Sequence, residues 1–113
     1  FLGLLMLRFD GTLYFAIAHV FLTAVRRAIV LTDPPPIVIL IEVESIIDID
    51  DRAVITIREF QKQLESVQIE FRFARIKTHV KEIMERGGLL QVVPAEHFYP
   101  TVQDGVDAYL DEK

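Results

Sequence analysis

Three aspartates stand within four positions near the middle of the sequence, directly after an apolar run: Asp48, Asp50 and Asp51. Two carboxylates spaced like Asp48 and Asp50 could hold a magnesium ion and supply a nucleophile and an acid or base, which is phosphatase-like chemistry. That chemistry also needs further carboxylates, a lysine and a cap that excludes water. Arg52 stands where such a site calls for a small hydroxyl residue. We therefore expect no enzyme activity from this stretch.

The same aspartates have two other interpretations. A phosphoacceptor aspartate of the receiver type would want an acidic pair after an earlier strand, and the strands expected to end at residues 9 and 15 offer none. The simpler interpretation is that Asp50 or Asp51 caps the helix that follows, because its carboxylate accepts from unpaired backbone N–H groups. Amides at a helix start also attract phosphate or a partner's acidic group, so the loop is a candidate regulatory surface.

A candidate anion site lies at the end of another expected strand. Arg75 and Lys77 follow the alternating apolar run of residues 67–73. Because the carboxyl ends of parallel strands converge, we expect these cations near the aspartate loop, where they could face an anionic ligand. Solvated charges at a helix start are the alternative. The helix starts expected near Asp10, Asp50 and Arg75 further predict weak binding of a nucleotide such as GTP or ATP.

Other residue types add no site. The histidines, at positions 19, 79 and 97, have no partner at metal-ligand spacing, so no metal is expected. The glycines form no phosphate-binding loop, and the absence of cysteine excludes disulfides and thiol chemistry. A net charge of -5, with lysine and arginine scattered along the chain, argues against nucleic acid as a partner. Beyond weak nucleotide binding, no cofactor is expected.

Length and composition predict one compact domain over residues 1–113, because the chain is long enough for a single core and too short for two. Hydrophobic residues make up 51% of it, which favours strands buried on both faces. The apolar segment 13–25 contains His19 and stops at Arg26, short of the roughly 20 residues that cross a bilayer. The first residue is Phe1 rather than Met, so we expect a fragment of a longer protein.

Period-two patterns and turn signals predict the strands that position these residues. Apolar runs at 3–9 and 12–15 are separated by Asp10-Gly11, a two-residue turn signal, which predicts an opening antiparallel hairpin. Residues 37–43 are almost continuously apolar, which is typical of a central strand. The alternation at 67–73 predicts a strand with one buried face and one face that is wet or meets a partner.

Between and after these strands, apolar residues recur at helical spacing. This spacing predicts helices over residues 18–29, 53–67, 80–84 and 102–110, the third of them ended by Gly87-Gly88, and a last short strand at 90–93. The predicted fold class is α/β, with a small mixed sheet and about four helices.

Four sequence blocks, in this order, carry a resemblance. They are R-F-D-G-T-L-Y-F-A at 8–16, I-I-D-I-D-D-R-A at 46–53, F-A-R-I-K at 73–77 and E-R-G-G-L at 85–89. Together they are similar to the first hairpin, the aspartate loop, and the next strand end and helix end of the STAS domain. Within that family the sequence resembles the C-terminal cytoplasmic domain of SulP-type sulfate and anion transporters, and the resemblance covers nearly the whole chain.

The resemblance implies a domain that does no chemistry of its own. It would sit at the cytoplasmic face of the cell membrane as part of an integral membrane transporter, the fragment itself being soluble. Its implied partners are the transmembrane part of the parent transporter, a second copy in a homodimer, and a carrier or regulatory protein. Its implied roles are regulation of anion transport, dimer contacts, and nucleotide or protein binding.

The aspartate loop departs from the family pattern. Asp50 falls at the family's loop aspartate, and Asp51 falls at the Ser or Thr that kinases phosphorylate in the free-standing relatives. Without a hydroxyl this position is no phosphorylation switch, and a fixed negative charge stands in its place. Ile17 is a second departure, because the transporter family often has Asn there. The loss of that side chain predicts a missing N-cap for the first helix, which typically costs about 1 kcal/mol.

One alternative to the transporter domain stays open. The free-standing relatives are anti-sigma factor antagonists, which act by binding other proteins. Asp51 argues against their usual phosphorylation switch, and the block at 8–16 resembles the transporter branch more closely. A stand-alone protein–protein interaction module of this kind is the second hypothesis.

Overall fold

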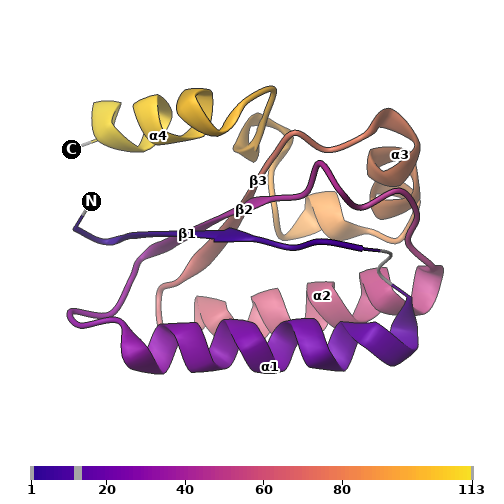
Figure 1. The fold of residues 1–113 in the computed structure, drawn as a ribbon, viewed down its shortest axis with the longest axis horizontal. Helices are drawn as coiled ribbons and strands as arrows, with labels where there is room; N and C mark the ends of the chain where they lie inside the picture. Colours follow the sequence, from indigo (N-terminus) through magenta and orange to yellow (C-terminus); the bar gives the residue numbers. More distant parts are fainter. Residues whose placement is uncertain (1, 12–13, 113) are drawn as a thin grey trace.

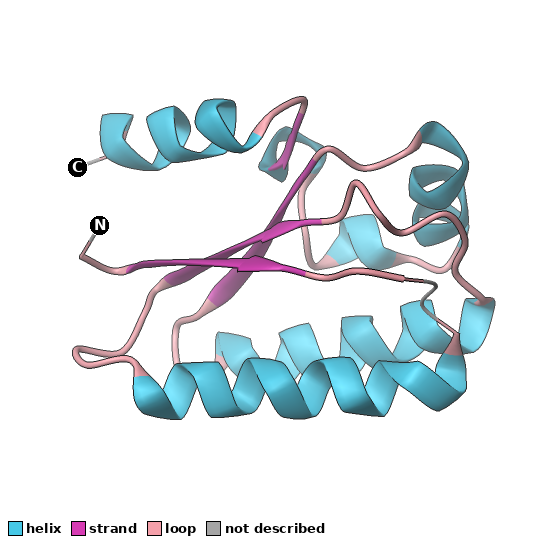
Figure 2. Ribbon diagram, viewed as in Figure 1, coloured by secondary structure: helices cyan, strands magenta, loops and turns pink. Residues whose placement is uncertain are grey.

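The computed structural model describes residues 2–11 and 14–112, the side chains of residues 15–17 excepted. Figures 1 and 2 show strands alternating with helices along the chain. The elements are β1 (Leu4–Arg8), α1 (Phe15–Leu31), β2 (Val38–Glu42), α2 (Asp51–Glu65), β3 (Glu70–Ala74), α3 (Thr78–Arg86), β4 (Phe98–Tyr99) and α4 (Val102–Asp111), with short 3-10 turns at Leu89–Gln91 and Ala95–His97. The α/β class predicted from the sequence is confirmed. No helix in the described ranges has the length and apolar character needed to cross a bilayer.

The four described strands form one sheet in the order β1-β2-β3-β4, and every neighbouring pair is parallel. Helices α1 and α2 lie side by side under one face, and α4 lies over the other (Figure 1). The inner strand β2 has its first four residues fully buried, so the predicted central strand is confirmed. Because all strands run the same way, their carboxyl ends meet at one edge, where the predicted site residues follow.

The predicted antiparallel hairpin is wrong. Strand β1 pairs with β2 in parallel, and the chain is already helical at Phe15. Residues 12–13 of the expected second strand lie outside the described part. The chain from Phe15 onward belongs to α1, whose buried face includes Ala18, Phe21 and Val25. A short apolar run has the same appearance at the start of a buried helix as in a strand, which explains the error.

Two further predictions about strands need correction. Residues 89–91 form a 3-10 turn, with the fully buried Leu89 and Val93 filling the core, and the last strand lies at Phe98–Tyr99 instead. The second face of β3, expected to be wet or to meet a partner, is covered by α4 of the same chain. Val67 lies in the turn before this strand and is 62% exposed. The sequence pattern thus placed the alternation correctly from Ile69 onward.

The helix boundaries follow from capping. Asp50 caps α2, and Gly88 takes the left-handed conformation (φ 82°) after α3, as the glycine pair predicted. Helix α1 begins after Tyr14, whose side chain makes no capping hydrogen bond. Ile17 lies inside the first turn rather than at the N-cap position, so the predicted loss of a cap at Ile17 is wrong.

Two apolar clusters hold the layers together. The larger lies between the sheet and helices α1 to α3, and it includes Phe21, Ile39, Ile57, Phe71 and Met84. The smaller lies under α4 and consists of Leu4, Val38, Leu40, Ala74, Val106 and Tyr109. Helix α4 comes close to the sheet at Gly105, where a Cβ atom would stand 2.8 Å from a Leu40 methyl group. A larger residue there would lift the helix.

The first and last elements are fastened to each other. The Tyr109 hydroxyl donates a hydrogen bond of 2.6 Å to the carbonyl oxygen of Leu2. In Figure 1 both ends of the chain lie on the same side of the molecule, close to the amino end of β1 and the carboxyl end of α4.

Candidate functional site

The aspartate loop, residues 43–51, leads from β2 into α2. Asp50 has extended backbone angles, and its Oδ1 accepts a 2.8 Å hydrogen bond from the backbone N–H of Ala53. The cap interpretation is thereby confirmed for Asp50. Asp51 is the first residue of α2 and is exposed, with its carboxylate at the positive end of the helix. Arg52 follows, also exposed, and its carbonyl oxygen accepts from the Thr56 hydroxyl at 2.9 Å.

Asp48 is held by different neighbours from those of Asp50. It accepts a hydrogen bond of 3.0 Å from the Tyr14 hydroxyl and one of 2.9 Å from the backbone N–H of Ile49. Its Oδ1 also lies 3.5 Å from Nε2 of His79. The Tyr14 hydrogen bond lowers the pKa of Asp48, and the same contact raises the pKa of Tyr14. The two carboxylates of the D-x-D stretch therefore serve separate donors. Across residues 2–11 and 14–112, no three acidic, histidine or cysteine side chains are placed to hold a metal ion.

Arg75 and Lys77 do lie at the carboxyl edge of the sheet, but each binds the same acidic residue. Arg75 donates to both oxygens of Glu44 at 2.8 and 2.9 Å, and Lys77 donates to the carbonyl oxygen of Glu44. Hydrogen bonding to Arg75 lowers the pKa of Glu44 and raises that of Arg75. Sequence reasoning missed Glu44, because nothing in the sequence links it to residues 31 and 33 positions away.

Asp10 completes this edge. Its Oδ1 accepts from Nε of Arg8 at 3.0 Å, and hydrogen bonds from Ser45 and Arg8 lower its pKa. The structure thus brings Asp10, Asp48 and Arg75 to one edge, as the topology predicted. Each of these three charged groups already has a hydrogen-bonding partner on this edge.

A hollow beside the start of α2 was not predicted. It has a volume of about 530 Å³ and is lined by Asp51, Ile55, Arg58, Arg86 and Gly87. Arg58 is anchored here by a 3.0 Å hydrogen bond from its Nη1 to the carbonyl oxygen of Gly87. The two arginines come from α2 and from the last turn of α3, which are 28 positions apart, so only the fold could reveal the pairing.

Two apolar side chains frame the same helix start. Ile47 is 63% exposed in the loop, and Ile55 is 45% exposed one helical turn after Asp51. Protein-binding surfaces combine apolar residues at their centre with polar and charged residues at their rim, and this helix start offers both kinds. We refer to Ile47, Asp51, Ile55, Arg58 and Arg86 as the α2 surface.

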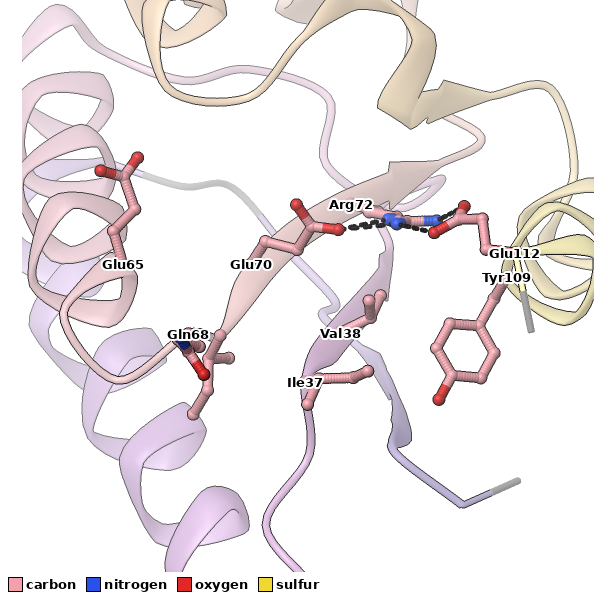
Figure 3. A pocket seen from close by; sticks show the side chains of 9 residues that line it. Ile37, Val38, Glu65, Gln68, Glu70, Arg72, Tyr109 and Glu112 are labelled. Atoms are coloured by element: carbon pink, nitrogen blue, oxygen red, sulfur yellow. Dashed lines mark hydrogen bonds and ion pairs between the residues drawn. The ribbon is translucent and has the colours of Figure 1, made fainter.

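A second polar cluster lies on the other face of the sheet (Figure 3). Arg72 of β3 is 2% exposed and makes bidentate contacts of 2.6 and 2.7 Å with Glu112, at the end of α4. It also donates a hydrogen bond of 2.6 Å to Glu70 and one of 3.3 Å to the Tyr99 hydroxyl oxygen. Burial works to lower the pKa of Arg72, but the hydrogen bonds that Arg72 donates to Glu112 and Glu70 outweigh it and raise that pKa. The cluster fixes the end of α4 beside a hollow of about 390 Å³.

Comparison with known proteins agrees with this arrangement. The family model described as "STAS domain" matches residues 2–105. Over 110 residues, 95% of its length, the chain is 28% identical to the Mycobacterium tuberculosis protein named "Probable sulfate transporter Rv1739c". It spans only 19% of that relative's length.

Solved structures share the fold. The STAS domain of a SulP transporter from Vibrio cholerae has a TM-score of 0.78 at 18% identity, with 98% of this chain and 84% of that chain covered. The murine solute carrier 26 family member A9 anion transporter, in its inward-facing state, has a TM-score of 0.83 at 17% identity, with 92% of this chain and 17% of that chain covered. The resemblance found in the four sequence blocks is confirmed, and the chain belongs to the STAS domain family.

Proposed function

We propose that the chain is the cytoplasmic, non-catalytic domain of a SulP-type sulfate or anion transporter, where it regulates transport by binding partners. The observation that carries this proposal is the match to a protein named as a probable sulfate transporter. The match covers 95% of this chain and 19% of that relative. That proportion is what a terminal regulatory domain of a larger membrane protein would have. The transmembrane part of the parent transporter is then the first partner.

The α2 surface is the proposed docking face for that partner or for a carrier or regulatory protein. Its support is the exposure of Ile47 and Ile55 together with the hollow between Arg58 and Arg86. Apolar contacts would supply affinity there, and the two arginines would receive an acidic group. Asp51 gives this face a permanent negative charge, so its binding would not depend on a kinase.

Catalysis and nucleotide binding have less support. Asp48 accepts from the Tyr14 hydroxyl and Asp50 caps α2, so a magnesium ion would have to displace these contacts. Arg75 and Lys77 are both engaged by Glu44, and an incoming phosphate would have to displace it. Weak GTP or ATP binding remains a prediction. Amide chemical shifts of residues 10, 50 and 75 that stay unchanged at millimolar nucleotide would remove it.

The first test is to sequence the gene upstream of the codon for Phe1 and plot the hydropathy of its product. We expect several apolar spans of bilayer length. A start codon within a few residues of Phe1 would contradict the proposal and leave the stand-alone interaction module, of the anti-sigma factor antagonist kind, as the better hypothesis.

The second test measures sulfate uptake by cells that express the full-length transporter. Ile55→Glu places a charge in the α2 surface, and Val67→Glu makes the same change at an exposed site beyond the far end of α2. We expect Ile55→Glu to change the uptake rate at equal expression and Val67→Glu to leave it unchanged. Equal effects of both variants would refute the proposed docking face. Light scattering of the isolated chain separately tests the homodimer that the family resemblance implies.

A further inference from the structure

Helix α1 is unusual for a helix on the surface of this domain. Its 17 residues include no aspartate or glutamate, although the chain as a whole carries 17 of them. Apolar residues also stand on its outer face, among the exposed His19, Thr23, Arg26 and Arg27. Val20, Val30 and Leu31 are 63%, 82% and 74% exposed, while Phe21 and Val25 fill the core on the opposite side. Exposed apolar residues that gather on one face and are rimmed by polar ones mark an interaction surface.

The outer residues of α1 form a continuous stripe. Val20, Ala24, Arg27 and Leu31 recur at steps of four, three and four, which places them along one face of a helix. All four are exposed, and a shallow groove runs past Val20, Ala24 and Arg27. With a rise of about 1.5 Å per residue, the helix is about 25 Å long. The stripe is therefore a long, narrow apolar surface with one cation in its middle.

Helix α2 adds charge to the same side of the molecule. Figures 1 and 2 show α1 and α2 side by side as one layer under the sheet, away from α4. Together the two helices carry five lysine or arginine residues and three carboxylates, whereas the whole chain carries 12 and 17. Two of those carboxylates, Asp51 and Glu65, stand at the ends of α2. The third, Glu59, lies within 4 Å of two cations, at 3.5 Å from Arg58 and 3.7 Å from Lys62.

We propose that the outer side of the α1–α2 layer lies on the surface of an anionic lipid bilayer. Apolar side chains among cations, on helices parallel to a broad face, are what an interfacial surface requires. Exposed Arg26, Arg27, Arg52 and Lys62 would meet lipid phosphates, and each such cation strengthens binding about fivefold near an anionic membrane.

This inference goes beyond the proposed function and does not depend on it. Binding of vesicles is measured on the chain alone, so it can succeed or fail whatever the upstream gene encodes. If the domain is attached to a transporter, the attachment holds the layer near lipid, and even weak binding would then be effective. The layer would in that case set the orientation of the domain beneath the membrane.

The test is flotation of the 113-residue chain with lipid vesicles. We expect the chain to float with vesicles of phosphatidylcholine and phosphatidylglycerol in equal parts, to stay behind with pure phosphatidylcholine, and to be released by high salt. Arg27→Glu should lower the partition coefficient by at least about tenfold. Leu31→Ser should lower it by about fivefold without changing charge.

Matched controls lie on other faces. Lys81→Glu in α3 makes the same charge change as Arg27→Glu, and Leu110→Ser in α4 changes a leucine that is 41% exposed. Both should leave flotation unchanged, and circular dichroism should show that all four variants fold. The proposal is overturned if neutral and anionic vesicles bind equally or not at all, or if the control variants lose as much binding. A dimer that Leu31→Ser dissociates, without vesicle binding, would also overturn it, because the stripe would then bind a second copy.

Discussion

Two arginines, three positions apart, make the same contact in opposite surroundings. Arg72 and Arg75 each bind a glutamate through two N–H groups, Glu112 in one case and Glu44 in the other. The side chain of Arg72 is 3% exposed and that of Arg75 is 42% exposed. The pKa of both guanidinium groups is raised, so both stay charged. The difference lies in what replaces the glutamate when it is lost: water reaches Arg75 and hardly reaches Arg72.

This comparison separates structure from surface chemistry. The Arg72 cluster has to stay intact because an unpaired buried charge is expensive, whereas the Arg75 pair can open and exchange partners with solvent at little cost. The candidate site edge is therefore adaptable, and the face under α4 is not. Substitutions at buried, half-buried and exposed contacts should therefore differ in their cost to stability, in that order.

The double substitution Glu70→Gln with Glu112→Gln should cost the most. It removes both carboxylates from Arg72 and leaves a buried charge with only neutral acceptors. We expect a loss of about 3 kcal/mol in the free energy of unfolding, measured by urea denaturation at neutral pH.

A control for that prediction removes the buried charge itself. Arg72→Met keeps much of the volume, and the two glutamates, which are 39% and 52% exposed, remain accessible to water. The loss should be clearly smaller than in the double variant. If Arg72→Met were the more damaging change, the buried pair would contribute net stability, and the contrast with Arg75 would have to be redrawn.

Asp50→Ala tests a contact of intermediate exposure. The variant loses the hydrogen bond to the Ala53 N–H and the favourable charge at the start of α2, so about 1 kcal/mol of stability should be lost. Asp51→Ala provides the matched control, because Asp51 adds charge but is not the N-cap. Thermal unfolding of both variants should show the larger shift for Asp50→Ala. The reverse order would move the cap to Asp51.

The backbone conformation of Arg75 allows its strain to be tested apart from its ion pair. Its φ of 62° is in the left-handed region, which favours glycine over any residue with a Cβ. Both Arg75→Ala and Arg75→Gly lose the ion pair with Glu44, but only the glycine variant also loses the backbone strain. We expect Arg75→Gly to melt at a higher temperature than Arg75→Ala and close to the wild-type protein. Equal melting of the two variants would show that backbone strain at this exposed site is negligible.

The smallest effect concerns acid stability. The folded-state pKa of Asp48 lies below its ordinary value of 3.8, chiefly because of the Tyr14 hydroxyl. A lowered carboxylate pKa stabilises the fold above that ordinary value, and the contribution is lost as the pH falls through the folded-state pKa. Asp48→Asn and Tyr14→Phe should therefore each lower the unfolding midpoint slightly near pH 7 and flatten its fall below pH 3.8, because both variants lack the contribution that the wild-type protein loses in acid. An unchanged acid limb in both variants would remove this role.

Local patterns predicted much of the fold. The inner strand, the stripe of α2, the Asp50 cap and the glycine end of α3 each depend on a few neighbouring residues, and each was predicted from the sequence. The hairpin at residues 3–15 and the strand at 90–93 failed because short apolar runs do not distinguish a strand from buried helix or turn. Tertiary packing decided both cases.

The candidate site was predicted only in part. Parallel strand ends put Asp10, Asp48 and Arg75 at one edge, as topology alone can foresee. The partners of these residues could not be foreseen, because Glu44 and Tyr14 are ordinary residues until the fold brings them within 3 Å. Arg72 was equally hidden, since an arginine in an alternating strand is expected to face solvent, whereas in the fold it is buried and binds Glu112 at the end of α4.

The hydrogen bond from Tyr109 to Leu2 gives the domain a mechanical property. A pull on the chain just ahead of β1 acts first on the Leu2 carbonyl, so the load passes to α4 before the β1–β2 ladder begins to open. The smaller apolar cluster and the Arg72 contacts then share it. The strand and the last helix should therefore respond to tension as one unit, and a displacement at the start of the domain would be felt at its end.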